Sequence, residues 1–137
     1  MALNLQMSVG LRNALLDQIE TTGSTAPKLQ IWTGTQPVDC ATTDSGTKLL
    51  ETALPSDWLA AASGGTKAIL GNPWTSTGLA AGTAGYFRLK PTSVTGTNAF
   101  MQGTVGTSGT DMTIDNAIIA VGQTVNVNSF TITAPNA

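Results

Sequence analysis

The pattern of apolar and polar residues predicts one amphipathic helix near the N-terminus. Within residues 9–21, leucine and isoleucine fall on one side and Arg, Asn, Asp and Glu fall mostly on the other. Ser8 is placed to cap the first turn, and Gly23 is placed to end the helix. The apolar stripe, which includes Leu11 and Leu15, has two interpretations: it packs on the chain's own sheet, or it docks on a partner subunit.

After the helix, short apolar stretches alternate with turn residues, which is typical of an all-β fold. The clearest stretch is Gly82–Lys90, in which Phe87 and Leu89 share one face while Arg88 and Lys90 share the other. We expect eight or nine strands, at residues 28–33, 47–54, 66–70, 74–79, 82–90, 98–105, 111–114, 117–121 and 123–133.

In the final predicted strand, the alternation of apolar and polar residues changes phase part-way along. Val125 and Val127 share one face, but Phe130 and Ile132 have the opposite parity. A regular strand buries only one of these pairs against a single core. We therefore expect a bulge or bend at Asn128 and Ser129; in a regular strand, one pair would face outward and mark a subunit interface.

These elements predict a single domain over residues 1–137, with an extended arm at 1–7, a helix within 8–22 and a β-sandwich over 28–133. The expected fold class is mainly β: an antiparallel jelly-roll-like sandwich with one N-terminal helix. A parallel α/β sheet would need repeated crossover helices, which the pattern lacks.

The chain is poor in charge, and this changes the range of expected partners. Only 10% of residues are charged, against about 25% in a typical domain. Six Lys and Arg residues do not favour nucleic-acid binding, and no apolar run is long enough to suggest a membrane span. A surface with few charges fits a subunit whose faces become covered; alternatively, Thr, Ser, Asn and Gly supply the polarity.

The sequence offers few candidate residues for catalysis. The chain contains no histidine, the residue that most general-base and metal sites use, and Cys40 is its single cysteine, expected to be inert. Asp111 and Asp115 adjoin turn residues, where Asp ordinarily binds nearby backbone. We expect no enzyme activity, no cofactor, no small-molecule substrate, and no catalytic, cofactor-binding or metal-binding residue.

The three tryptophans are the remaining candidates for binding. Trp32 has the opposite parity to Leu29 and Ile31, which places it on the outer face of the sheet. Exposed tryptophans bind sugars or anchor interfaces, whereas covered ones belong to the core. The candidate partner-interface residues are Leu11, Leu15, Trp32, Trp58 and Trp74.

Several segments carry a resemblance to a known class of proteins. They are LQIWTG (29–34), LPSDWLAAASGG (54–65), GTAGYFR (82–88), QGTVGTSG (102–109), GQTVNV (122–127) and SFTIT (129–133). With these segments the chain resembles, from about residue 8 to its end, small structural proteins of tailed bacteriophages. It is most similar to the cement, or decoration, proteins of short-tailed phage heads.

The resemblance implies a jelly-roll protein that clamps the major capsid protein from outside the virion, often as a homodimer, after synthesis in the host cytoplasm. Collar, neck and tail proteins share the same Thr- and Gly-rich style, so a tail, collar or neck component is an alternative. A carbohydrate-binding module that uses the tryptophans is a second alternative. The family has no catalytic motif whose residues could be matched in this chain.

Overall fold

The structure is a computed structural model that describes residues 4–23, 25–71, 73–92 and 98–137. It is mainly β, with a curled sheet and a single N-terminal helix, and this confirms the predicted fold class. The helical elements are α1 (Val9–Gln18) and a π-helical turn, η1 (Ile19–Gly23). The strands are β1 (Lys28–Thr33), β2 (Lys48–Ala53), β3 (Thr66–Ala68), β4 (Trp74–Thr77), β5 (Gly82–Lys90), β6 (Met101–Gly106), β7 (Met112–Ile114), β8 (Ile118–Ile119) and β9 (Thr124–Thr133).

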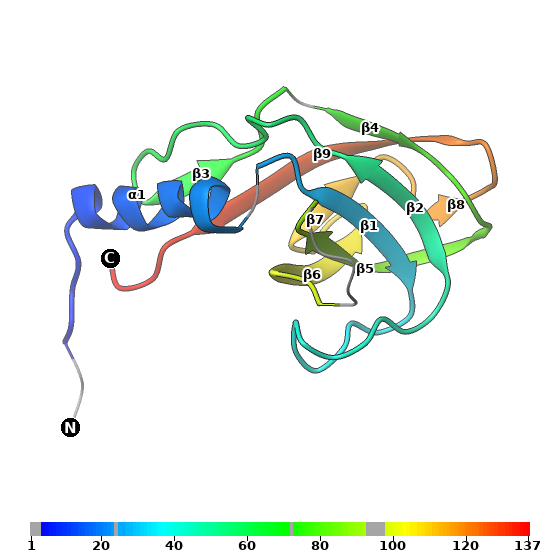
Figure 1. Cartoon of the computed structure of the whole chain (residues 1–137), viewed down its shortest axis with the longest axis horizontal. Coiled ribbons are helices and arrows are strands. Elements are labelled where there is room, and N and C mark those ends of the chain that lie inside the picture. Colours follow the sequence, from blue (N-terminus) through cyan, green and yellow to red (C-terminus); the bar gives the residue numbers. More distant parts are fainter. Residues whose placement is uncertain (1–3, 24, 72, 93–97) are drawn as a thin grey trace.

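The strands form one sheet that curls around the core (Figure 1). Its order is β2-β1-β5-β6-β7-β9-β3, while β4 pairs with β9 and β8 pairs with β5. Every strand pair is antiparallel except β6 with β7. The backbone N–H of Leu79, just after β4, donates to the carbonyl of Leu49 at 2.7 Å. This bond joins β2, at one end of the strand order, to the segment that follows β4, the partner of β9 near the other end, so the curled sheet surrounds its core.

The core contains the apolar face of β5 and a group of aromatic side chains. Phe87 and Leu89 are buried there, as their alternation predicts. The ring of Phe87 meets that of Phe130 edge to face at 5.3 Å, and Phe130 lies 6.2 Å from Trp74. Trp74 in turn packs against Trp58 at 6.0 Å. The aromatic contacts therefore link β5, β9, β4 and the segment before β3.

Strand β9 contains the irregularity that its sequence phase predicts. Thr113 of β7 pairs with Ser129, whereas the next residue, Ile114, pairs with Val127. Asn128 is thus the extra residue of a β-bulge, and it is exposed. The bulge resets the phase, so that Val125, Val127 and Phe130 are buried and Ile132 packs against the same core.

The two halves of β9 have different neighbours. Its first half pairs with β4, where Trp74 faces Val127, and its last residues pair with β3, where Lys67 faces Ile132. In Figure 1 the far end of β9 lies beside β3 and α1, at the left of the molecule. Strand β9 therefore connects the curled sheet to the helix.

The bulge gives the first testable prediction. Deleting Asn128 should place one apolar pair of β9 in water, because the chain would lose its phase correction. At about 1.5–3 kcal/mol for each fully buried side chain, losing the Val125 and Val127 pair should lower the free energy of unfolding by about 3–6 kcal/mol. Urea unfolding followed by tryptophan fluorescence measures this change.

The control is Asn128→Ala, which keeps the chain length at the same exposed position and should change stability by about 0.5 kcal/mol or less. Equal stability of the deletion and the alanine variant would show that the bulge has no role in burying the two pairs.

Candidate partner-binding surface

Helix α1 packs on the rest of the chain through its polar side. Its two buried residues are Arg12 and Leu16, whereas Leu11 and Leu15 are each 50% exposed. An ordinary amphipathic helix has the opposite arrangement, with its apolar stripe on the core. The interpretation in which the stripe as a whole packs on the chain's own sheet is therefore wrong for Leu11 and Leu15, and it holds for Leu16.

Arg12 and Asn13 attach the first turns of the helix to the ends of β3 and β9. The Nε and Nη2 atoms of Arg12 donate to the carbonyl of Ala134 at 3.2 and 2.7 Å. The backbone N–H of Gly65 donates to Asn13 Oδ1 at 2.8 Å. Gly65 has φ +77°, and a Cβ there would lie 2.4 Å from Arg12 Cζ, so glycine is required for this approach.

Lys67, on β3, attaches the last turns of the helix to the sheet. Its Nζ donates to Asp17 Oδ1 at 2.7 Å and lies 3.1 Å from Glu20 Oε2. Glu20 Oε1 also accepts from the backbone N–H groups of Trp58 and Leu59, at 3.0 and 2.9 Å. The side chain of Lys67 is only 2% exposed, so its charge depends on these two carboxylates.

The ion pair shifts the pKa of both partners. The hydrogen bond from Lys67, followed by that from the backbone N–H of Ala62, lowers the pKa of Asp17. Burial by itself lowers the pKa of Lys67, but the hydrogen bonds with Asp17 and Glu20 outweigh it, so the pKa of Lys67 is raised. The charged form of each group is therefore favoured in the folded protein.

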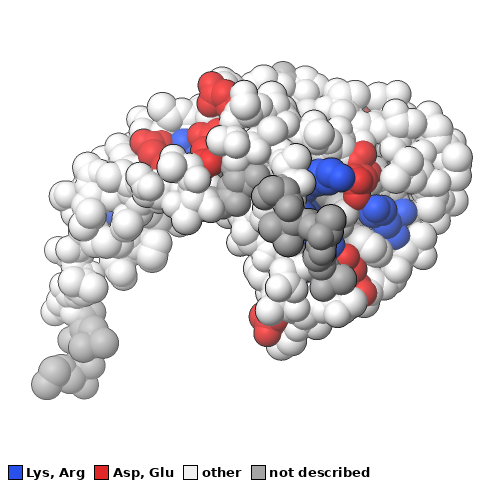
Figure 2. All heavy atoms as spheres, in the orientation of Figure 1, with Lys and Arg blue, Asp and Glu red and all other residues white. Residues whose placement is uncertain are grey.

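While its charged side chains bond to neighbouring segments, the helix presents an apolar surface to solvent. Val9, Leu11 and Leu15 are exposed, and a groove of about 420 Å³ adjoins Leu15. The groove is lined by Leu15, Gln18, Ile19, Thr22, Phe100 and Met101. We call Leu11 and the groove residues the helix surface. In Figure 2 the charged side chains gather where the helix meets β3 and over β1 and β2, and most of the remaining view is uncharged.

Two of the candidate interface residues lie inside the molecule instead. Trp58 is completely buried and Trp74 is 5% exposed, and both belong to the core. Trp58 also packs edge to face on Phe100 at 6.2 Å, so it supports the groove from within. The expectation that Trp58 and Trp74 contact a partner is corrected, because neither presents a surface to one.

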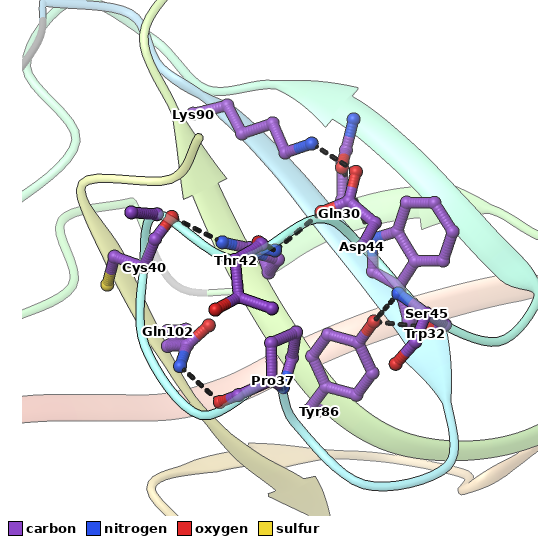
Figure 3. A network of polar contacts seen from close by, with 12 residues as sticks. Gln30, Trp32, Pro37, Cys40, Thr42, Asp44, Ser45, Tyr86, Lys90 and Gln102 are labelled. Carbon is purple, nitrogen blue, oxygen red and sulfur yellow. Dashed lines mark hydrogen bonds and ion pairs between the residues drawn. The ribbon is translucent and has the colours of Figure 1, made fainter. Parts of the chain in front are cut away.

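Trp32 lies on the outer face of the sheet, as its parity predicts, but a loop and its neighbours half-bury it (Figure 3). Its ring stacks on Tyr86 with centroids 6.4 Å apart and planes 11° apart. Its Nε1 donates to Gln30 Oε1 at 3.2 Å, and Lys90 Nζ lies 6.0 Å from the ring centroid. Trp32 therefore has structural contacts on its sheet side.

The loop at residues 34–47 covers the polar face of β5 (Figure 3). Arg88, which is completely buried, donates to the carbonyl of Thr42 at 2.7 Å, to Asp44 Oδ1 at 2.8 Å and to the carbonyl of Cys40 at 2.6 Å. Lys90 also donates to Asp44. These charged groups bind the loop to the sheet.

The charges of the chain serve its own structure. Five basic residues donate hydrogen bonds to acceptors of the same chain, namely Arg12, Lys48, Lys67, Arg88 and Lys90. The sixth, Lys28, forms an ion pair with Glu51 at 3.7 Å. The two carboxylates singled out in the sequence join neighbouring strands: Asp111 accepts from Thr104, and Asp115 accepts from Asn126. Sequence reasoning missed Arg12 and Lys67; the one available signal was that charges are scarce.

Residues 4–23, 25–71, 73–92 and 98–137 contain no group of three or more His, Cys, Asp or Glu side chains arranged to hold a metal ion. No helix of this part of the chain is long and apolar enough to cross a membrane. Comparison with protein-family models, with curated proteins and with solved structures gave no match for this chain.

The Lys67 ion pair predicts a pH dependence of stability. The pKa of Asp17 lies below the value of about 3.9 for an unfolded Asp, so its contribution is complete above that pH and is lost as the pH falls through the folded pKa. The raised pKa of Lys67 gives a contribution that is present below about 10.4 and is lost as the pH rises through its folded pKa.

We expect the free energy of unfolding to fall between pH 5 and pH 2 (roughly the range over which such carboxylates titrate) more steeply in the wild type than in Asp17→Asn. Lys67→Met should cost about 3 kcal/mol at pH 7, because it leaves Glu20 without its cation. Asp57→Asn is the control, because it makes an equal charge change at an exposed residue that lines the same hollow as Asp17, Glu20 and Lys67, on another side of the helix from the Leu15 groove. Parallel pH profiles for Asp17→Asn and the wild type would contradict the assignment.

Proposed function

We propose that this chain is a non-enzymatic structural protein of a phage virion, which binds the outside of the major capsid lattice and stabilises the head. The observation that carries the proposal is the helix surface, an exposed apolar surface on a helix whose charged side chains, Arg12 and Asp17, bond to other segments of the chain. Exposed apolar side chains that lie together mark interaction sites on soluble proteins. The resemblance to capsid cement proteins supplies the class of partner.

The arrangement suits a protein that acts by burying surface. The helix is fixed to the sheet at both ends, by Arg12 and by Lys67, so its apolar side is held in one orientation. A preorganised surface loses little freedom on binding. Many copies on a closed lattice then add their effects, because each contact resists separation of the capsid subunits beneath it.

Of the two rival functions, carbohydrate binding makes less use of this geometry. A carbohydrate-binding module would need exposed aromatic rings, but Trp58 and Trp74 are in the core and Trp32 stacks on Tyr86. A tail, collar or neck component could use the helix surface in the same way. Copy number separates it from the cement role: hundreds of copies per virion favour the head, and about six or twelve favour the neck.

The homodimer expected from the sequence stays a prediction. Two of the strands, β3 and β8, have only three and two residues, and short edge strands limit pairing between chains. Sedimentation across the micromolar range gives the mass of the free protein, and a monomer mass throughout, without self-contact in the particle, would rule the dimer out.

The helix surface gives a binding prediction. The double variant Leu11→Ser and Leu15→Ser should bind capsids about 30-fold more weakly than the wild type. Each leucine is half-exposed, so about 1 kcal/mol of further burial is available at each, or about 2 kcal/mol together. Co-sedimentation of the protein with stripped heads measures the affinity.

Val38→Ser is the matched control, because Val38 is 89% exposed but lies on the loop between β1 and β2. It should bind like the wild type. Unfolding curves show whether each variant keeps its fold. A folded double variant with wild-type affinity would remove the helix surface from the capsid contact.

A second prediction concerns the particle. Heads stripped of this protein should rupture at a lower temperature than complete heads, and adding the purified chain back should restore the threshold. Release of packaged DNA, followed by dye fluorescence during heating, measures the rupture. Identical thresholds for stripped and complete heads would end the cement proposal.

A further inference from the structure

The helix lies along an outer edge of the sheet, beside β3 and the segment that precedes it (Figure 1). The strand order ends at β3, but the preceding segment continues it, because it runs antiparallel to β3. The backbone N–H of Ala60 donates to the carbonyl of Ala68 at 2.8 Å, and that of Leu70 donates to the carbonyl of Trp58 at 3.0 Å. We call residues 58–65 the edge segment, because their other side faces the helix instead of a strand.

A row of helix side chains accepts the hydrogen bonds that this edge offers. Three residues, spaced so that they share one helix face, accept from backbone N–H groups of the edge segment: Asn13 from Gly65 at 2.8 Å, Asp17 from Ala62 at 3.0 Å and Glu20 from Leu59 at 2.9 Å. We call Asn13, Asp17 and Glu20 the polar row. In a sheet, the carbonyl groups of a neighbouring strand accept such bonds. The polar row therefore takes the place of a further strand.

The helix is held to the sheet mainly by these polar contacts. Of the residues of α1, only Arg12 and Leu16 are buried, and Leu16 is not part of the main core. A helix of 10 residues is marginal in water without packing. Loss of the polar row would therefore release the helix and uncover the edge segment, while the core inside the curled sheet keeps its own contacts.

We propose that the helix is an autoinhibitory cover: when it is released, the edge segment pairs with the edge segment of a second copy of this chain. An uncovered strand edge is a template for pairing with another chain. Two copies related by a two-fold axis would pair antiparallel, so that each satisfies the backbone groups of the other. Residues 60–62 are all alanine, so the middle of the segment has none of the lysines or prolines that protect other edges.

The two states of the helix expose different binding surfaces. The docked helix presents the helix surface and covers the edge segment. The released helix loses the fixed arrangement of Leu15 and Ile19 beside Phe100 and Met101, and it uncovers the edge. Pairing through the edge segment is therefore separate from any contact made by the helix surface, and it is tested without a capsid.

The main test is the triple variant Asp17→Ala, Glu20→Ala and Lys67→Met. It removes both carboxylates of the polar row together with the cation that they bind, so that no buried charge is left unpaired. Sedimentation of the full chain at micromolar concentration should give about twice the mass of the wild type. Asp57→Asn is the matched control, because it produces the same formal net charge at an exposed residue outside the polar row, and its mass should equal that of the wild type.

A folded triple variant with the mass of the wild type would overturn the proposal. Adding Ala61→Lys to the triple variant should restore the wild-type mass, because a lysine on a strand edge opposes pairing, and Ala61 is exposed. Association that persists with this lysine would place the contact elsewhere and would also overturn the proposal.

Asp17→Ala alone decides the matter if the triple variant does not fold, because Lys67 keeps its contact with Glu20. In hydrogen exchange followed by NMR, the N–H of Ala62 should exchange about tenfold faster than in the wild type, since its bond to a charged acceptor is lost, while the N–H groups of β5 should be unchanged. The mass of this variant should rise with concentration more than that of the wild type. Wild-type exchange at Ala62 would overturn the cover, and a wild-type mass at every concentration would overturn the pairing.

Discussion

The complete burial of the Arg88 guanidinium is the constraint on which the outer face of the sheet depends. A buried cation is costly unless a counter-charge and hydrogen-bond acceptors surround it. The loop between β1 and β2 supplies both, through the carboxylate of Asp44 and the carbonyls of Cys40 and Thr42. The loop cannot leave the sheet without unpairing that charge. Strand β5 is therefore interior on both faces, with an apolar core on one side and a polar one on the other.

The same principle places the helix, and it leads to the proposed function. The chain has few charges, and those of the helix are used to dock it: Arg12 on Ala134, and Asp17 and Glu20 on Lys67. Burying Lys67 requires the acidic side of the helix to face inward. The leucines on the opposite side are then left in water, where burial against a partner stabilises the complex. The apolar surface is thus a consequence of how the polar side is bound.

Strand β9 couples these two regions. Its bulge at Asn128 lets one strand bury side chains of both parities, and its two halves pair with β4 and β3. Because β3 carries Lys67, the register of β9 sets where the helix is held relative to the curled sheet. A change of phase in the strand would therefore affect both the core and the helix surface.

The sequence by itself determined the features that depend on local period and turn chemistry. The alternation in Gly82–Lys90, the cap at Ser8 and the phase conflict around Asn128 all appear in the structure, because side-chain direction in strands and helices follows the backbone repeat. Only the tertiary structure decided which face of each element is covered. Trp58 is internal because it packs against Trp74 and Phe100, which are distant in sequence. Leu15 is external because charge pairing with Lys67, also distant in sequence, outweighed the apolar pattern of the helix, and no local pattern records such contacts.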